Sequence, residues 1–129
     1  PPKIKHTLSE FCVNHGINSY AVSETQKYGH VTYFWNGNRS EKFSNELETW
    51  EEIESDKVSF DERPWMKSAE ITDDLIEAIK SEKYDFIRCN FPNGDMPYEK
   101  IVDNGFSYLM SYDGLIYVNM SYYHTTSNR

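Results

Sequence analysis

The sequence has few cysteines and no long apolar run. Its two cysteines, Cys12 and Cys89, lack the CxxC or Cys/His spacing of a zinc site, so we expect a reduced cytosolic pair rather than a disulfide. No stretch approaches the roughly 18 apolar residues that a membrane span needs, and the residues that follow Pro1 lack the apolar core of a signal peptide. The chain is therefore expected to be cytoplasmic and to have no membrane partner.

Basic charge is also scarce. The 13 Lys and Arg residues face 21 Asp and Glu residues, which gives a net charge of −8 at pH 7. A chain of this sign is repelled by phosphate backbones and anionic lipid, so nucleic acid is not expected as a partner. A length of 129 residues suits one compact core.

The spacing of apolar residues predicts alternating helices and strands. The helices are expected at 7–16, 24–37 and 68–82, and the strands at 17–23, 48–53 and 85–90. Thr7 and Glu10 form a capping box for the first helix, and Ser68 is expected to cap the third. The apolar stripe of that third helix is Ile71, Leu75, Ile76 and Ile79. This alternation predicts an α/β fold with parallel strand pairs.

The C-terminal part of the chain has a different pattern. Asp113 and Gly114 stand between two runs of apolar and aromatic residues, 108–112 and 115–118. A two-residue turn of this kind between such runs predicts a β-hairpin.

Four segments resemble a known enzyme family. The run SETQKYGHVTYFWNGNRS at 23–40 is the longest, and PPKIKHTLSEF, FDERPWMKSAEITDDLIEAI and KYDFIRCNFPNGDM stand in the same order as in that family. Together they make residues 1–96 similar to part of the alkaline-phosphatase-like domain of cofactor-independent (2,3-bisphosphoglycerate-independent) phosphoglycerate mutases, especially the plant-type branch. Residues 97–129 would then be a divergent or permuted tail.

The resemblance implies a fold, an activity and a cofactor. The fold would be a partial alkaline-phosphatase-like sheet with flanking helices. The activity of the parent family is a glycolytic isomerase reaction, which interconverts 3-phosphoglycerate and 2-phosphoglycerate through a phosphoserine. The family uses two divalent metal ions, manganese or magnesium.

Two residues match functional positions of the family. Lys27 resembles the catalytic and substrate-binding lysine that neutralises the transferring phosphoryl group, a role that suits a cation at a strand-to-helix turn. Asp95, in NGDM, resembles a carboxylate ligand of one metal. A turn residue is the alternative reading of Asp95, because it directly follows Asn93 and Gly94.

The departures from the family are as informative as the matches. Where the family continues with Val-Gly-His after Asp-Met, this chain has Pro97, Tyr98 and Glu99. The nucleophilic serine, the Asp-His-Gly-Asn motif and the substrate-binding arginines of the family have no counterpart. A single carboxylate cannot hold two metals, so the chain alone is expected to be inactive and not to bind both ions. The missing remainder of the enzyme is a candidate partner.

The sequence is compatible with more than one relation between this chain and the mutase. It can be a fragment of the mutase, or a set of joined segments. It can also be a permuted form, since YLMSYDG at 108–114 resembles a family segment that normally precedes the N-terminal Pro-Pro. The alternative function is a non-catalytic acidic binding or scaffold domain that uses the tyrosines of the hairpin as its contact surface.

Overall fold

The chain forms a four-stranded parallel sheet with helices on both faces. The structure is a computed structural model that describes residues 1–58, 62, 63, 65–92 and 115–120. Its elements are α1 (Leu8–Asn14), β1 (Ser19–Glu24), α2 (Thr25–Val31), β2 (Glu48–Ile53), α3 (Ser68–Lys80), β3 (Phe86–Phe91) and β4 (Leu115–Met120). The strand order is β2-β1-β3-β4, and each neighbouring pair is parallel. The predicted α/β fold with parallel pairs is confirmed.

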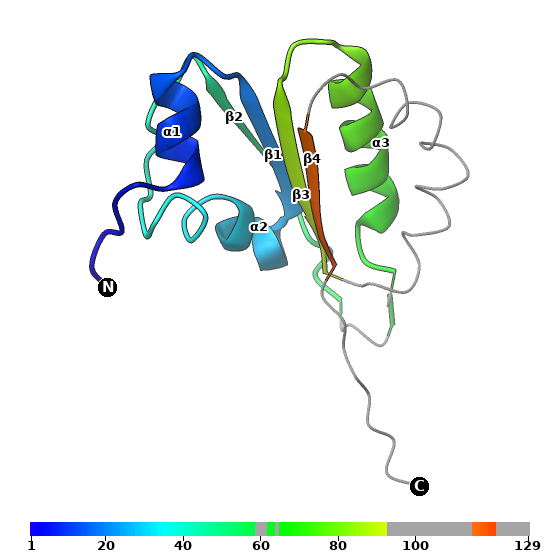
Figure 1. Ribbon diagram of the computed structural model, residues 1–129. Coiled ribbons are helices and arrows are strands. Elements are labelled where there is room, and N and C mark those ends of the chain that lie inside the picture. The colour runs from blue at the N-terminus through cyan, green and yellow to red at the C-terminus, as the bar shows by residue number, and fades with distance from the viewer. Residues whose placement is uncertain (59–61, 64, 93–114, 121–129) are drawn as a thin grey trace, which may run out of the picture.

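The three layers are visible in Figure 1, where α1 and α2 lie on one face of the sheet and α3 on the other. The main apolar core lies between the sheet and α3. Its buried members are Tyr20, Val22, Ile71, Leu75, Ala78, Ile79, Ile87, Cys89 and Phe91. Both faces of β1 and β3 are buried, as is usual in a parallel sheet covered by helices.

Helix α1 has the Thr7 cap that the sequence predicts. The backbone N–H of Glu10 donates to Oγ1 of Thr7 at 3.3 Å, and the Glu10 carboxylate accepts a hydrogen bond from the N–H of His6 at 2.8 Å. Gly16, which follows the helix, has a φ of +67°, a conformation that favours glycine. The predicted Thr7 cap is therefore confirmed, whereas the Glu10 carboxylate bonds to the N–H of His6, one residue before the N-cap, and the reciprocal bond of a capping box is not the one formed.

The second helix is shorter than the sequence predicts. We expected it to reach Gly37, but α2 ends at Val31. The Thr32 hydroxyl donates to the carbonyl of Tyr28 at 2.7 Å, and the N–H of Phe34 bonds to a carbonyl five residues back rather than four. Phe34, beyond the end of the helix, is 57 % exposed.

The predicted cap of the third helix was also wrong. Ser68 is the first residue of α3, and the N-cap position belongs to Lys67, whose carbonyl accepts the first helical hydrogen bond, from Ile71. The apolar stripe is confirmed for Ile71, Leu75 and Ile79, which are buried.

The second arm of the predicted hairpin is a strand of the main sheet. It corresponds to β4, which pairs in parallel with β3. The other arm, 108–112, lies outside the described residues, so the hairpin itself and the contact surface that the scaffold alternative needs remain predictions.

Gly37 packs against the N-terminal segment, whereas Gly16 does not. Both have positive φ, but a Cβ on Gly37 would lie 2.6 Å from the carbonyl oxygen of Ile4, whereas a Cβ on Gly16 would meet nothing within 4 Å. Gly16→Ala should lower the free energy of unfolding by about 1 kcal/mol, from backbone strain alone. Gly37→Ala should cost about 1 to 3 kcal/mol more, because of the added clash. Urea unfolding measures both, and equal losses would contradict the close contact at Gly37.

Candidate functional site

The carboxyl ends of the parallel strands define one edge of the sheet. This edge is the lower end of the sheet in Figure 1, and α2 begins there directly after β1. In α/β proteins with parallel sheets, ligands bind just beyond this edge, where the loops leave the strands. The edge is therefore the first place to look for a site.

Lys27 lies at this edge, in the first turn of α2. Its side chain is half-buried. Among the described residues it makes no ion pair and no side-chain hydrogen bond. The structure thus places the predicted lysine at a strand-to-helix turn, with an ammonium group that no described carboxylate neutralises.

The predicted metal ligand is Asp95. Asp95 lies outside the described residues, so its role as a ligand remains a prediction. Within the part of the chain that the structure describes, no group of three or more His, Cys, Asp or Glu side chains could hold a metal ion. The described residues therefore do not form a metal centre by themselves.

Glu24 is a residue of the edge that the sequence reasoning missed. It is the last residue of β1 and only 1 % exposed. Its carboxylate accepts hydrogen bonds from Oγ of Ser55 at 2.9 Å and from the backbone N–H of Lys67 at 3.5 Å. Burial raises the pKa of this carboxyl, and the two hydrogen bonds oppose the rise. A charged residue at the end of an otherwise buried strand was the signal in the sequence.

Two other cations near the start of α3 are already paired. The Asp56 carboxylate contacts Arg63 at 2.5 Å and the Lys67 ammonium at 2.9 Å. Hydrogen bonds from Arg63 and Lys67 lower the pKa of Asp56, and the bond to Asp56 raises that of Lys67. Unlike Lys27, these two cations have an acidic partner.

The far end of α2 is attached to the sheet by a buried arginine. Nε of Arg88, on β3, donates to the carbonyl of Val31 at 2.8 Å, and its guanidinium lies 5.3 Å from the ring centroid of Trp35. Arg88 is 1 % exposed, and burial lowers its pKa to about 10, while the nearby carboxylate of Glu48 opposes the change. Its other two guanidinium nitrogens have no partner in the described ranges.

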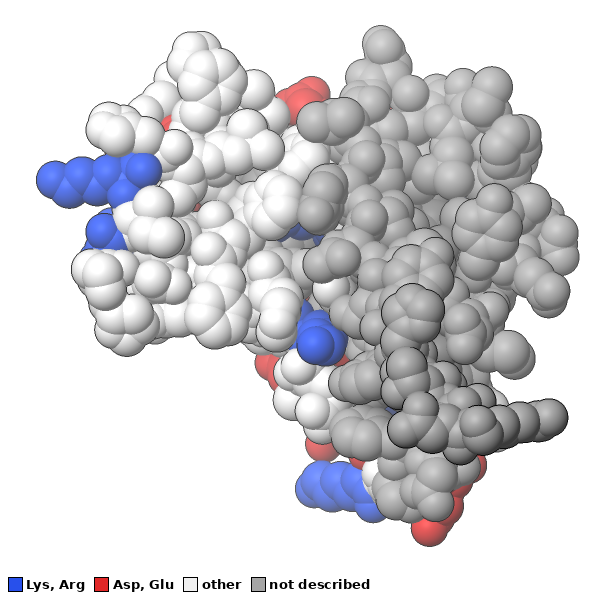
Figure 2. Space-filling view, turned by 60° about the horizontal axis from the view of Figure 1, so that its bottom comes forward, with Lys and Arg blue, Asp and Glu red and all other residues white. Residues whose placement is uncertain are grey.

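Figure 2 brings the lower end of the molecule forward. The described surface in this view is mostly uncharged, and its basic and acidic side chains are scattered rather than gathered into a patch of one sign. Binding of an anion on this side would therefore depend on individual cations.

Comparison with known proteins decides the family. The family model described as Metalloenzyme superfamily matches residues 1–99, which is most of the chain. The chain belongs to the Metalloenzyme superfamily. The resemblance to cofactor-independent phosphoglycerate mutases is confirmed as well, because the curated relatives carry that name.

The curated relatives are much longer than this chain. The 2,3-bisphosphoglycerate-independent phosphoglycerate mutase of Trypanosoma brucei brucei is 62 % identical over 96 residues, which are 74 % of this chain and 17 % of that enzyme. Phosphoglycerate mutase 1 of Arabidopsis thaliana is 50 % identical over 97 residues, again 74 % of this chain and 17 % of the relative. The chain thus spans a small part of the length of the curated relatives it matches.

A solved structure agrees with the sequence match. A crystal structure of Leishmania mexicana phosphoglycerate mutase, determined at low cobalt concentration, superposes with a TM-score of 0.73 and 46 % sequence identity. The match covers 86 % of this chain and 22 % of the Leishmania chain. The predicted phosphoglycerate mutase fold is therefore confirmed for this chain.

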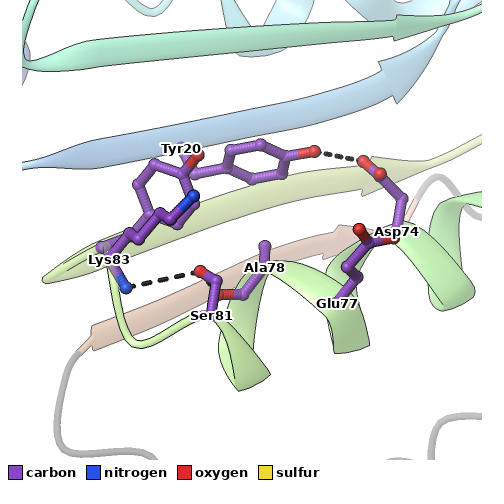
Figure 3. Close-up of a pocket in the computed structure, with 7 residues that line it drawn as sticks. Tyr20, Asp74, Glu77, Ala78, Ser81 and Lys83 are labelled. Carbon is purple, nitrogen blue, oxygen red and sulfur yellow. Dashed lines mark hydrogen bonds between the residues drawn. The ribbon is translucent and has the colours of Figure 1, made fainter.

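The chain also has a cavity at the opposite edge of its sheet, where the strands begin. Figure 3 shows Tyr20, near the start of β1, with its hydroxyl directed at the carboxylate of Asp74, to which it donates a hydrogen bond. The ring centroid of Tyr84 is 4.8 Å from that of Tyr20. The cavity, of about 140 Å³, is lined by Tyr20, Asp74, Glu77, Ala78, Ser81, Lys83 and Tyr84. It belongs to the amino edge of the sheet, away from the edge that carries Lys27.

No helix within the described residues is long and apolar enough to cross a membrane.

Asp74 gives the fold a pH dependence that can be measured. Burial raises the pKa of its carboxyl, while the hydrogen bond from Tyr20 lowers it. The folded state therefore binds the proton more tightly than the unfolded state, and the wild type should lose stability as pH rises from about 4, the ordinary value for Asp, to the raised pKa. Asp74→Asn removes this loss, so the stability of the variant relative to wild type should increase across that pH range.

The measurement is urea unfolding of both proteins from pH 4 to pH 7. Glu82→Gln, which removes an exposed carboxylate just beyond α3, is the control and should follow the wild-type curve. A constant difference between Asp74→Asn and wild type would show that Asp74 has an ordinary pKa.

Proposed function

We propose that this chain is the part of a phosphoglycerate mutase that binds the transferring phosphoryl group, with Lys27 as the cation that neutralises it. The parent reaction would be the interconversion of 3-phosphoglycerate and 2-phosphoglycerate through a phosphoserine. The observation that carries the proposal is the Lys27 ammonium at the carboxyl edge, which no described carboxylate neutralises.

The electrostatics of the edge support this role. A phosphoryl group in transfer carries negative charge on its oxygens, and a cation held at a fixed position stabilises that charge. Lys67 and Arg63 lie near the same edge but are occupied by Asp56. A cation already bound to a carboxylate has less charge to offer a phosphate, so Lys27 is the better candidate.

We further propose that Asp95 contributes one carboxylate to a divalent metal site. The superfamily name and the cobalt of the Leishmania structure support the use of a divalent metal, with manganese or magnesium as the expected ions. When bound, such an ion would supply Lewis acidity at the phosphoryl oxygens. The described residues do not complete a metal site, so the other ligands and the nucleophile would come from the remainder of the enzyme.

We propose that residues 1–96 are a portion of the phosphatase-like domain and that residues 97–129 are a divergent or permuted tail. Because the chain lacks a counterpart of the nucleophilic serine, it should not convert 3-phosphoglycerate by itself. We also propose that the chain is located in the cytoplasm.

A chimera tests the proposed role of Lys27. Residues 1–96 of this chain would replace the matching segment of the Trypanosoma brucei brucei relative, so that the relative supplies the missing residues. The chimera should interconvert the phosphoglycerates in an enolase-coupled assay. Lys27→Ala should lower kcat by about 10²-fold or more, the usual effect of removing a group that stabilises transition-state charge. Lys57→Ala removes an exposed lysine and is the matched control.

Full activity of the Lys27→Ala chimera would contradict the proposal. The isolated chain provides a second check, because formation of 2-phosphoglycerate by the purified chain with added Mn²⁺ would disprove the expected inactivity.

A further inference from the structure

Glu24 connects three elements at the carboxyl edge. It ends β1 and is the residue directly before α2. One oxygen of its carboxylate accepts from Oγ of Ser55, just after β2, and the other accepts from the N–H of Lys67, at the start of α3. Next to it, Oγ1 of Thr25 accepts from the N–H of Ser55 at 3.1 Å. The segments that leave β1 and β2 and the one that enters α3 are therefore joined around a single carboxylate.

Burial makes this carboxylate costly to move. At 1 % exposure, its charge has lost most of its hydration, and an unpaired buried charge strongly destabilises a fold. The Lys67 side chain attracts the carboxylate, whereas Asp56 repels it. The hydrogen bonds from Ser55 and Lys67 thus provide the main compensation, and they exist only while the three segments keep their relative positions.

Helix α2 needs such an anchor. It has seven residues, and no side chain caps its N-terminus. A helix of this length is not stable by itself, so tertiary contacts set its position. The contact of Arg88 with Val31 holds its C-terminal end. The Glu24 and Thr25 contacts with Ser55 hold its N-terminal end, and Lys27 lies between the two anchors.

We propose that Glu24 is the positioning residue for Lys27. Its carboxylate fixes the first turn of α2 against the segment after β2 and the start of α3, and so fixes the ammonium group at the edge. Glu24 acts through Lys27, without touching the substrate. The functional consequence rests on the proposed role of Lys27, but the structural consequence does not.

Hydrogen exchange of the full chain tests the structural part. Ser55→Ala removes one partner of the carboxylate with little change in volume, and Glu24→Ala removes the carboxylate. Both should speed exchange of the hydrogen-bonded amides at 28–31 in α2, and of the Ile71 amide at the start of α3, by about tenfold, the effect of losing roughly one hydrogen bond. The amides of β3 should keep their rates, and Glu24→Gln, which retains an acceptor, should show a smaller effect.

The matched control is Glu54→Gln, which changes an exposed carboxylate next to Ser55 and should leave all rates unchanged. Unchanged exchange at 28–31 in both Glu24→Ala and Ser55→Ala would overturn the proposal. A uniform acceleration that includes β3 would overturn it as well, because it would indicate a general contribution to stability rather than local positioning.

Kinetics of the chimera described above test the functional part. Glu24→Ala should lower kcat by about 10²-fold with little change in KM, because a displacement of about 1 Å in a catalytic group can cost this much. The double variant with Lys27→Ala should be no slower than Lys27→Ala alone, since both changes remove the same interaction. Glu24→Gln should restore part of kcat.

The outcomes separate the two proposals. If Lys27→Ala has no effect, the proposed function fails, whatever the exchange data show. If Lys27→Ala abolishes turnover while Glu24→Ala leaves kcat unchanged, only the positioning role fails.

Discussion

The parallel pairing of β1 with β2 on one side and β3 on the other determines where the polar residues of this chain lie. Val22, in the middle of β1, is in register with Glu51 of β2 and Cys89 of β3. Since parallel strands end at the same edge, the segments that leave β1 and β2 meet there. The contacts of Glu24 and the position of Lys27 both follow from that meeting.

The two faces of the sheet differ in how they hold their helices. The α3 face is an apolar core, and its helix is positioned by ordinary side-chain packing. The other face carries buried polar groups, among them Arg88, Asn90 and Glu48. Glu48 accepts hydrogen bonds from Asn36 and from the backbone of the loop before β2. Directional polar contacts therefore position α2, the short helix that carries Lys27.

Local signals in the sequence predicted most of the fold. One error, the end of α2, has a local cause, whereas the contacts of Glu24 are long-range. Alternating apolar patterns predicted the helices and strands before residue 92, because each pattern reflects burial within one element. The end of α2 was wrong because the hydroxyl of Thr32 competes for a helical carbonyl. The place of Lys27 at a strand-to-helix turn could be predicted from its motif. The contacts of Glu24 could not, because its partners Ser55 and Lys67 are 31 and 43 residues away.

The proposed function requires that Lys27 and Asp95 lie close together at the carboxyl edge of the sheet. A test attaches a nitroxide spin label to Asp95→Cys in the full chain and records paramagnetic broadening of backbone amides. Cys12 and Cys89 are buried, and burial raises the pKa of both thiols, so they should react slowly with the label. Strong broadening in the first turn of α2 would agree with the claim. Broadening around Tyr20 at the amino edge, with sharp signals from α2, would contradict it.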